Sequence, residues 1–274
     1  MNTQDILNIA LREAGLEALP EDSGVFVERD GVRKVLAGVD LEGPEVLLAK
    51  ELGCQAVISH HPHAGSAVVD FHKVMVRQID RMVHFGVPIN RAQKLLRRRM
   101  AQVELNHHSA NHDRAASAAR LLGLGYMNVH MPADMITEGF VQAYLDDRFA
   151  QQPKKTLGEV LEALGELPEY RASLVKPVIR VGGEGDYAGR IAVLMAGGTG
   201  GGAEVFKAYF EAGVGTIVCM HVPEDVKKAV EEQGIGNVIV AGHMPSDSIG
   251  INRLIAAWRR AGLEVIPCCG IVGE

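Results

Sequence analysis

Apolar positions along the first 60 residues alternate between a helical period and short strand-like runs. Residues 3–15 repeat apolar side chains on a helical period, whereas "VRKVLAGVD" (32–40) predicts a strand. "GPEVLLAKELG" (43–53) then predicts a helix that Gly53 ends, and "CQAVISH" (54–60) predicts the next strand. A strand, a helix and a strand in about 30 residues form a βαβ unit, so we expect these two strands to lie parallel.

The middle of the chain carries weaker patterns. A long helical pattern runs from about Phe71 to Arg99, and "VELNHHSANHD" (103–113) predicts a strand that runs into polar residues. "RAASAARLLGLG" predicts an alanine-rich helix that glycine closes, and residues 131–180 indicate a small connecting module. The basic side of the long helix, in "RAQKLLRRRMAQ", indicates a solvated face or a subunit contact rather than a nucleic-acid site.

The last third of the chain returns to a regular alternation of strands and helices. The predicted strands are "GRIAVLMAGG", "VGTIVCMH", "NVIVAGH" and "LEVIPCCG", and the helices between them are "AEVFKAYFEAG", "PEDVKKAVEEQG" and "SIGINRLIAAWRRAG". We therefore expect an α/β fold made of two α/β blocks with mixed, largely parallel sheets. The expected segments are 1–130, a connecting segment 131–180, and 181–274.

Composition narrows the class of protein. The 274 residues are 47% hydrophobic and 23% charged, which is ordinary for a globular protein with a sizeable core. The net charge of -6 provides no basic excess for nucleic acid. The four cysteines have no zinc-ribbon spacing, no signal peptide is evident, and no window approaches the roughly 20 apolar residues of a membrane span. We expect a soluble cytoplasmic protein that binds neither membrane nor nucleic acid.

Most of the eleven histidines gather at three points of the chain. The groups are His60, His61 and His63; His107, His108 and His112; and His221 with His243. The first and third groups directly follow predicted strands. Because sites in open parallel sheets form at the carboxyl ends of the strands, these histidines are candidate functional residues.

His60 and His61 are adjacent at the end of a strand. On an extended backbone their side chains point to opposite sides, so the pair suits two ions on either side of the chain better than one ion. The alternative is a turn in which both rings face water, since Pro62 suits a turn.

Each of two aspartates has both a structural and a functional interpretation. Asp113 stands five residues after His108 at the opening of the alanine-rich helix, where it is either a plain N-cap or a carboxylate that bridges two cations. Asp247 follows His243 by four residues, a spacing that brings both side chains to one face around a helix start. Aspartate is also common in first helical turns for purely structural reasons.

The glycine-rich segment "AGGTGGGAE" (196–204) lies between a predicted strand and a predicted helix. Gly198, Gly200 and Ala203 form G-x-G-x-x-A, and no P-loop lysine follows. The segment is either a tight turn or a place where an anionic substrate group meets a helix N-terminus.

The order of the motifs resembles that of the Nif-three-like family (NGG-one-interacting-factor-three), which includes proteins described as GTP cyclohydrolase I type 2. "AVISHHP" and "VIVAGH" carry the resemblance, which covers roughly residues 1–125 and 175–274. It implies the fold of that family, with a metal site in the cleft between the two blocks.

The resemblance also implies a set of metal ligands. The two histidines of the family's first motif match His60 and His61. The aspartate of its middle motif, H-T-N-x-D, is best matched by Asp113 as a bridging ligand. The last motif, G-H-x-x-[ST]-E, matches His243 and Asp247, with aspartate in place of glutamate. Either the backbone approaches more closely here, or one metal is held more weakly.

Two segments depart from the family pattern. Ser109 stands where the family has its middle histidine, which leaves His108 or His112 to serve instead. The family's G-D-x-x-x-H segment is replaced by "CMHVPED", in which His221 and Asp225 occur in the opposite order. These changes indicate a site tuned for a different substrate.

Taken together, these residues predict a dinuclear metal protein. Imidazole and carboxylate ligands suit two divalent ions of zinc, manganese, iron, cobalt or nickel. The expected activity is hydrolysis of a small molecule, a nucleotide or a cyclic amide, by metal-bound hydroxide. His63, His108 and His221 are the candidate catalytic proton carriers, because imidazole titrates near neutral pH.

Two other functions remain open at this point. The protein is alternatively a non-catalytic metal-binding scaffold or interaction protein, or a Rossmann-like nucleotide binder that uses residues 196–204. The resemblance further implies a homo-oligomer, commonly a hexamer.

Overall fold

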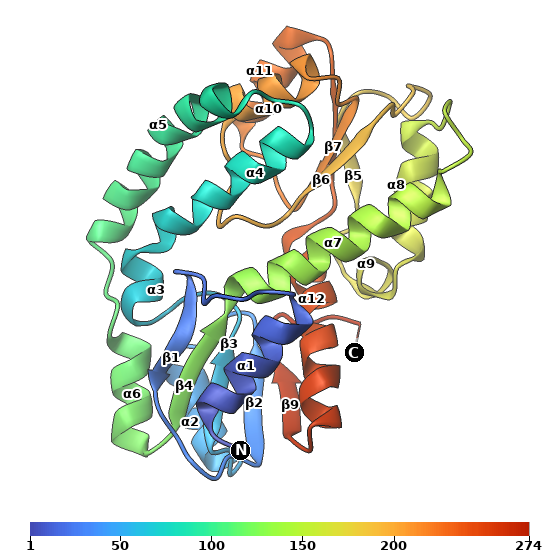
Figure 1. The fold of residues 1–274 in the computed structure, drawn as a ribbon. Coiled ribbons are helices and arrows are strands. Elements are labelled where there is room, and N and C mark those ends of the chain that lie inside the picture. The colour runs from blue at the N-terminus through green and yellow to red at the C-terminus, as the bar shows by residue number, and fades with distance from the viewer. Residues whose placement is uncertain (274) are drawn as a thin grey trace.

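The computed structural model describes residues 1–273 and contains two β-sheets (Figure 1). The five-stranded sheet has the order β1-β4-β3-β2-β9, and the four-stranded sheet has the order β5-β8-β7-β6. The strands are β1 (Ser23–Val27), β2 (Lys34–Gly38), β3 (Ala56–Ser59), β4 (Gly125–Val129), β5 (Val178–Val181), β6 (Ile191–Leu194), β7 (Thr216–Cys219), β8 (Asn237–Val240) and β9 (Glu264–Cys268). All pairs are parallel except β1–β4 and β5–β8, which confirms the expected mixed, largely parallel α/β fold.

Helices surround both sheets. They are α1 (Thr3–Glu13), α2 (Gly43–Glu51), α3 (Gly65–Val69), the 3₁₀ helix η1 (Phe71–Val76), α4 (Arg77–His84), α5 (Ile89–His108), α6 (Arg114–Leu122), α7 (His130–Arg148), α8 (Leu157–Glu166), α9 (Pro168–Ala172), α10 (Ala203–Glu211), α11 (Glu224–Gln233) and α12 (His243–Arg260). None of the described helices combines the length and the apolar content that a membrane span requires.

The five-stranded sheet buries apolar side chains on both faces. One cluster joins α1 and α12 to the sheet around the fully buried Trp258, whose indole N–H donates to the carbonyl of Ile6 at 3.1 Å. A second cluster joins α2 and α6 to the opposite face, around Leu36 and Tyr126. Because both faces are covered, the strands are mostly apolar, as parallel strands usually are.

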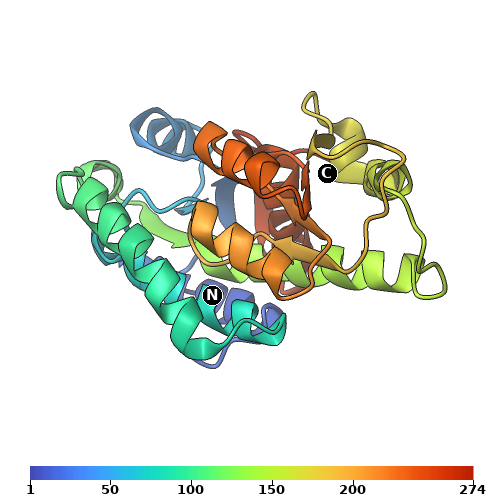
Figure 2. The ribbon, with the colours of Figure 1, turned by 90° about the horizontal axis from the view of Figure 1, so that it is seen from above.

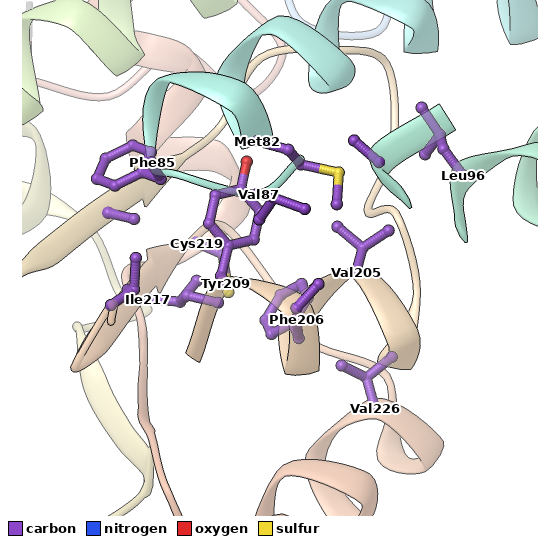
Figure 3. Packing of buried hydrophobic residues seen from close by; sticks show 14 of the residues in the cluster. Met82, Phe85, Val87, Leu96, Val205, Phe206, Tyr209, Ile217, Cys219 and Val226 are labelled. Carbon is purple, nitrogen blue, oxygen red and sulfur yellow. The ribbon is translucent and has the colours of Figure 1, made fainter. Parts of the chain in front are cut away.

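The four-stranded sheet is covered on one face by helices from the N-terminal part of the chain. Met82 of α4, Phe85 directly after α4 and Leu96 of α5 pack with Phe206 and Tyr209 of α10 in one buried cluster (Figure 3). Helices α7, α8 and α9 contribute to the cluster on the other face. Figure 2 shows the α4–α5 pair and the α8–α9 pair on different sides of the molecule.

Several expected elements differ from the structure. Residues 103–113 are not a strand: they form the last turns of α5 and a loop, because Ala92, Leu96 and Val103 continue one buried helical face. The helical pattern from Phe71 to Arg99 is divided into shorter helices, with a break at Gly86 to Pro88. The strands β1 and β4 and the long helix α7 were not expected.

The last strand joins the first sheet. β9 pairs in parallel with β2, with Lys34 opposite Glu264, although α12 before it begins at the end of β8 in the other sheet. Helix α7 likewise contacts both β6 and α12 and crosses between the two sheets (Figure 1). The division at 130 and 180 stays a prediction about folding units, and sheet membership does not follow it.

Helices α7 and α12 approach each other closely at Gly250. A Cβ atom at this position would lie 2.7 Å from the carbonyl carbon of Ala133 and 2.9 Å from Thr137 Oγ1. The Thr137 hydroxyl also donates to the carbonyl of Ser246 at 2.9 Å. Only glycine therefore allows this backbone contact.

We predict that Gly250→Ala lowers the free energy of unfolding by about 1–3 kcal/mol, because the new methyl group forces two packed helices apart. Gly139→Ala is the matched control, since Gly139 is an exposed position of α7 with no atom near its missing Cβ. The control should stabilise the protein by about 0.5–1 kcal/mol through helix propensity. Urea unfolding of both variants checks this, and equal stabilities would contradict it.

Candidate metal centre

Four histidines meet where three strands end. His60 and His61 directly follow β3, His130 follows β4 as the first residue of α7, and His243 is the first residue of α12 just after β8. The ring centroids of His60 and His61 are 4.9 Å apart, and those of His61 and His243 are 5.1 Å apart. The cluster thus joins the carboxyl edges of both sheets, the edge where sites form in parallel sheets.

Two short segments with the same sequence pattern provide two carboxylates next to the histidines. "HMPAD" (130–134) opens α7 and "HMPSD" (243–247) opens α12, each with its aspartate one turn after its histidine. Residues four apart lie on one face of a helix, so Asp134 and Asp247 point the same way as their histidines. The close contact of α7 and α12 therefore brings both pairs to one place.

Asp247 lies between three imidazoles. Its Oδ1 is 3.6 Å from Nε2 of His60, and its Oδ2 is 3.4 Å from Nε2 of both His61 and His243. Asp134 approaches His60 with Oδ1 at 3.4 Å and His130 with Oδ2 at 3.7 Å. These separations exceed hydrogen-bond length but suit atoms that share a cation between them.

Three sets of ligand atoms lie within 4.8 Å of one another. They are His60, Asp134 and Asp247; His61, His243 and Asp247; and His60, His61 and His130. The first two sets share Asp247 and are otherwise different. A carboxylate with one oxygen toward each set can bridge two cations.

The centre is buried and has unsatisfied polar atoms. Both ring nitrogens of His60, both carboxylate oxygens of Asp247 and Oδ1 of Asp134 have no hydrogen-bond partner among the described residues, and all three side chains are buried. Buried polar groups without partners cost several kcal/mol, roughly 2–7 each. Bound cations would satisfy these atoms, so the residues present fit a metal.

The electrostatics of the protein alone favour positive charge at this place. Burial lowers the pKa of His60, but Asp247 and Asp134 outweigh it and raise that pKa to about 10. Burial raises the pKa of Asp247, while His60, His61 and His243 hold it well below its usual range. The Asp247 carboxylate therefore remains ionised and attracts cations.

Two further aspartates orient the imidazoles. The Nδ1–H of His61 donates to Asp40 at 2.8 Å, and the Nδ1–H of His130 donates to the fully buried Asp22 at 2.7 Å. Hydrogen bonds from His61 and His63 hold the pKa of Asp40 well below its usual range. Each bond leaves Nε2 directed at the centre, the usual arrangement behind a metal-bound imidazole.

Four of the expected ligands come together, and Asp113 does not. His60, His61, His243 and Asp247 meet as described, whereas Asp113 is exposed at the start of α6 and accepts hydrogen bonds from Ser117 and Arg120. The preceding segment is a helix and a loop rather than a strand, so Asp113 does not reach the edge of the sheet. The family's H-x-x-x-D spacing is met instead by His130 and Asp134.

The expected proton carriers are placed differently from one another. His221 follows β7, is exposed, lines the cavity described below, and has its ring 5.2 Å from that of His243. Nε2 of His63 is 3.0 Å from Asp40 and Nδ1 is 3.5 Å from Glu42 Oε1, so it supports the site from behind. His108 is exposed at the end of α5, and the cavity wall contains His107 instead.

A cavity of about 380 Å³ opens beside the cluster. His61, His130, Asp134, His243 and Asp247 line one part of it. Side chains of η1, α4, α5 and α10, the end of β7 and the glycine-rich loop before α10 line much of the rest. The volume suits a small molecule rather than a macromolecule.

His130, Asp134 and the orienting Asp22 and Asp40 were not found from the sequence. The recurrence of H-M-P-x-D at 130–134 and 243–247 is the pattern that identifies the first two. The two orienting aspartates have no such motif, because only the folded chain brings them to the imidazoles.

Two mostly parallel sheets with a buried histidine–aspartate cluster between their strand ends define an α/β protein whose cluster could hold metal. Residues 1–268 match the family described as Duf34/NIF3 (NGG1p interacting factor 3), and the chain belongs to this family. A search of curated proteins found no match.

Solved structures agree with this assignment. A NIF3 superfamily protein from Sphaerobacter thermophilus is 35% identical, with 98% of each chain covered and a TM-score of 0.94. Reduced HcgD from Methanocaldococcus jannaschii is 15% identical with a TM-score of 0.58, and 97% of each chain is covered. TTHA1606 from Thermus thermophilus is 18% identical with a TM-score of 0.56 and the same coverage, so these last two share the fold.

We predict that Asp40→Asn weakens metal binding by about 10- to 100-fold, because His61 loses the carboxylate that orients it. Asp113→Ala is the control: its carboxylate is exposed and bonded to Ser117 and Arg120, so metal affinity should stay at the wild-type level. Competition titration with a chromophoric chelator measures both. Loss of affinity in the Asp113 variant would restore that residue as a ligand.

Proposed function

We propose that this protein binds two divalent metal ions and uses them to hydrolyse a small molecule. The observation that carries the proposal is the position of Asp247, whose two unpartnered oxygens face different imidazoles in a buried centre. One buried carboxylate between two sets of nitrogen and oxygen donors suits a pair of ions better than a single ion.

Each of the two ions would be held by its own set of residues, with Asp247 common to both sets. His60 and Asp134 complete one set, and His61 and His243 complete the other. His130 adds an imidazole beside Asp134 and is held there by Asp22. His63 stays in a supporting position through Asp40, and His108 has no part in the proposed centre.

The donor atoms are nitrogen and oxygen, which suits zinc, manganese, iron, cobalt or nickel. Cys219 lines the same cavity, but burial raises the pKa of its thiol to about 12, and none of the three sets of ligand atoms includes it. A pair of such ions would lower the pKa of a bound water and polarise a substrate oxygen.

His221 is the proposed proton carrier. It lies on the cavity wall next to His243, is exposed, and has no carboxylate partner among the described residues. An exposed imidazole on the cavity wall can accept a proton during attack and return it to the leaving group.

Metal content tests the first half of the proposal. After reconstitution and removal of excess ion, the wild-type chain should retain about two ions. Asp134→Asn removes a donor from only one set and should leave about one ion, whereas Asp247→Ala removes the shared donor and should leave fewer. Less than about half an ion per wild-type chain would refute the proposal.

Activity tests the second half. The metal-loaded protein is screened on nucleotides, phosphoesters and cyclic amides beside His61→Ala, which should be inactive. His221→Gln should lower kcat about 10²- to 10⁴-fold at unchanged metal content. His108→Gln is the matched control and should keep full activity. Full metal occupancy with no hydrolysis and with metal-dependent partner binding would favour a scaffold instead.

Oligomerisation and location stay predictions. The homo-hexamer follows from the family resemblance, and the cytoplasmic location follows from the composition of the chain. A native mass of about six chains would support the hexamer.

A further inference from the structure

One wall of the cavity is a single face of helix α5. Arg99, Val103, Asn106 and His107 line the cavity, and their spacing places them on one side of the helix. His107 marks the end near the metal centre: its ring stacks on Phe71 at 4.8 Å, and the Phe71 ring lies 5.4 Å from that of His130.

Arg99 marks the other end of this wall. It precedes His107 by eight residues, which corresponds to about 12 Å along a helix axis. Phe206 and Tyr209 of α10 provide apolar surface in the same cavity. A molecule that reaches from the histidine cluster to Arg99 is therefore elongated and has an apolar or aromatic body.

The cavity has one cation that no carboxylate of the described residues neutralises. Nε of Arg81 is 3.3 Å from Glu138, and its Nη2 donates to Gln142 and to the carbonyl of Val193. Arg99 has no carboxylate partner among residues 1–273. Outside the histidine cluster, the charge left for a ligand is therefore positive and belongs to Arg99.

Two hydrogen bonds hold the guanidinium of Arg99 in place and leave other N–H donors of the group available for a ligand. Its Nε donates to the carbonyl of Gly200 at 3.2 Å, and its Nη1 donates to Gln102 at 2.8 Å. Nη2 donates no hydrogen bond to a described residue, and a guanidinium has five N–H donors. An arginine fixed in this way loses little further freedom when it binds an anion.

The glycine-rich loop provides the support for Arg99. Gln78 Nε2 donates to the carbonyls of Gly197 and Thr199 at 2.7 and 2.6 Å. A Cβ atom at Gly201 would lie 2.7 Å from Gln78 Oε1, and one at Gly198 would lie 3.0 Å from a side-chain carbon of η1. The glycines thus serve close packing against η1 and α4, in agreement with the tight-turn interpretation.

We propose that this cavity binds a small organic anion, with its carboxylate or phosphate group on Arg99 and its other end at the histidine–aspartate cluster. The part of the ligand at the cluster rests on the proposed function, whereas the anion subsite rests on the α5 wall alone. Arg99 then selects substrates by charge and positions their reacting end at the cluster, beyond the His107 end of this wall.

The experiment measures binding to the metal-loaded full chain by calorimetry. The probes are 3-phenylpropionate and phenyl phosphate, with the uncharged 3-phenylpropionamide for comparison. Arg99→Gln should raise the Kd of both anions about 10- to 100-fold and leave the amide unchanged. Arg99→Lys keeps the charge but loses the planar fork of the guanidinium, so its Kd for both anions should lie between those of wild type and Arg99→Gln.

Arg98→Gln is the matched control, because Arg98 is exposed on the same helix and does not line the cavity. Its Kd values should stay within about twofold of wild type. Equal anion affinity in wild type and Arg99→Gln would overturn the proposal, as would no binding of either anion. The same titration on metal-depleted chain keeps the two proposals separate, since an anion subsite on Arg99 survives even where the metal centre does not form.

Discussion

The backbone contact between α7 and α12 at Gly250 is the constraint on which the site depends. Each helix begins with a histidine and brings an aspartate one turn later, so the relative position of the two helices decides whether those side chains meet. A side chain at this crossing would separate them. The cluster is assembled from segments far apart in the chain, and it is close helix packing that makes one site of them.

Burial then gives the cluster its chemical character. His60, Asp134 and Asp247 are removed from water and have no hydrogen-bond partners at several of their polar atoms among the described residues. Such groups would be costly if the site served packing alone. Asp22 and Asp40 orient two imidazoles from behind, so the protein itself fixes the direction of these rings.

The cavity combines two parts of the chain with different roles. Strand ends and helix starts carry the histidines and aspartates on rigid elements, while α4 and α5 reach across from the N-terminal segment to cover the second sheet. The inner face of α5 thereby becomes a wall of the cavity and meets the glycine-rich loop where Arg99 donates to Gly200. Variation along that face can change the preferred ligand without disturbing the residues of the cluster.

The sequence by itself determined the βαβ unit, the regular alternation after Gly189, the paired histidines after β3 and the G-H-x-x-x-D pattern of α12. These features are local, because the hydrophobic period and the position of a strand end depend on residues that are neighbours in the sequence. It did not determine that α5 extends through His108, that β9 joins the first sheet, or that Asp134 rather than Asp113 meets His60. Local patterns record which side chains are buried but not against which partner, so which histidines and aspartates meet was decided only when tertiary packing brought α7 beside α12.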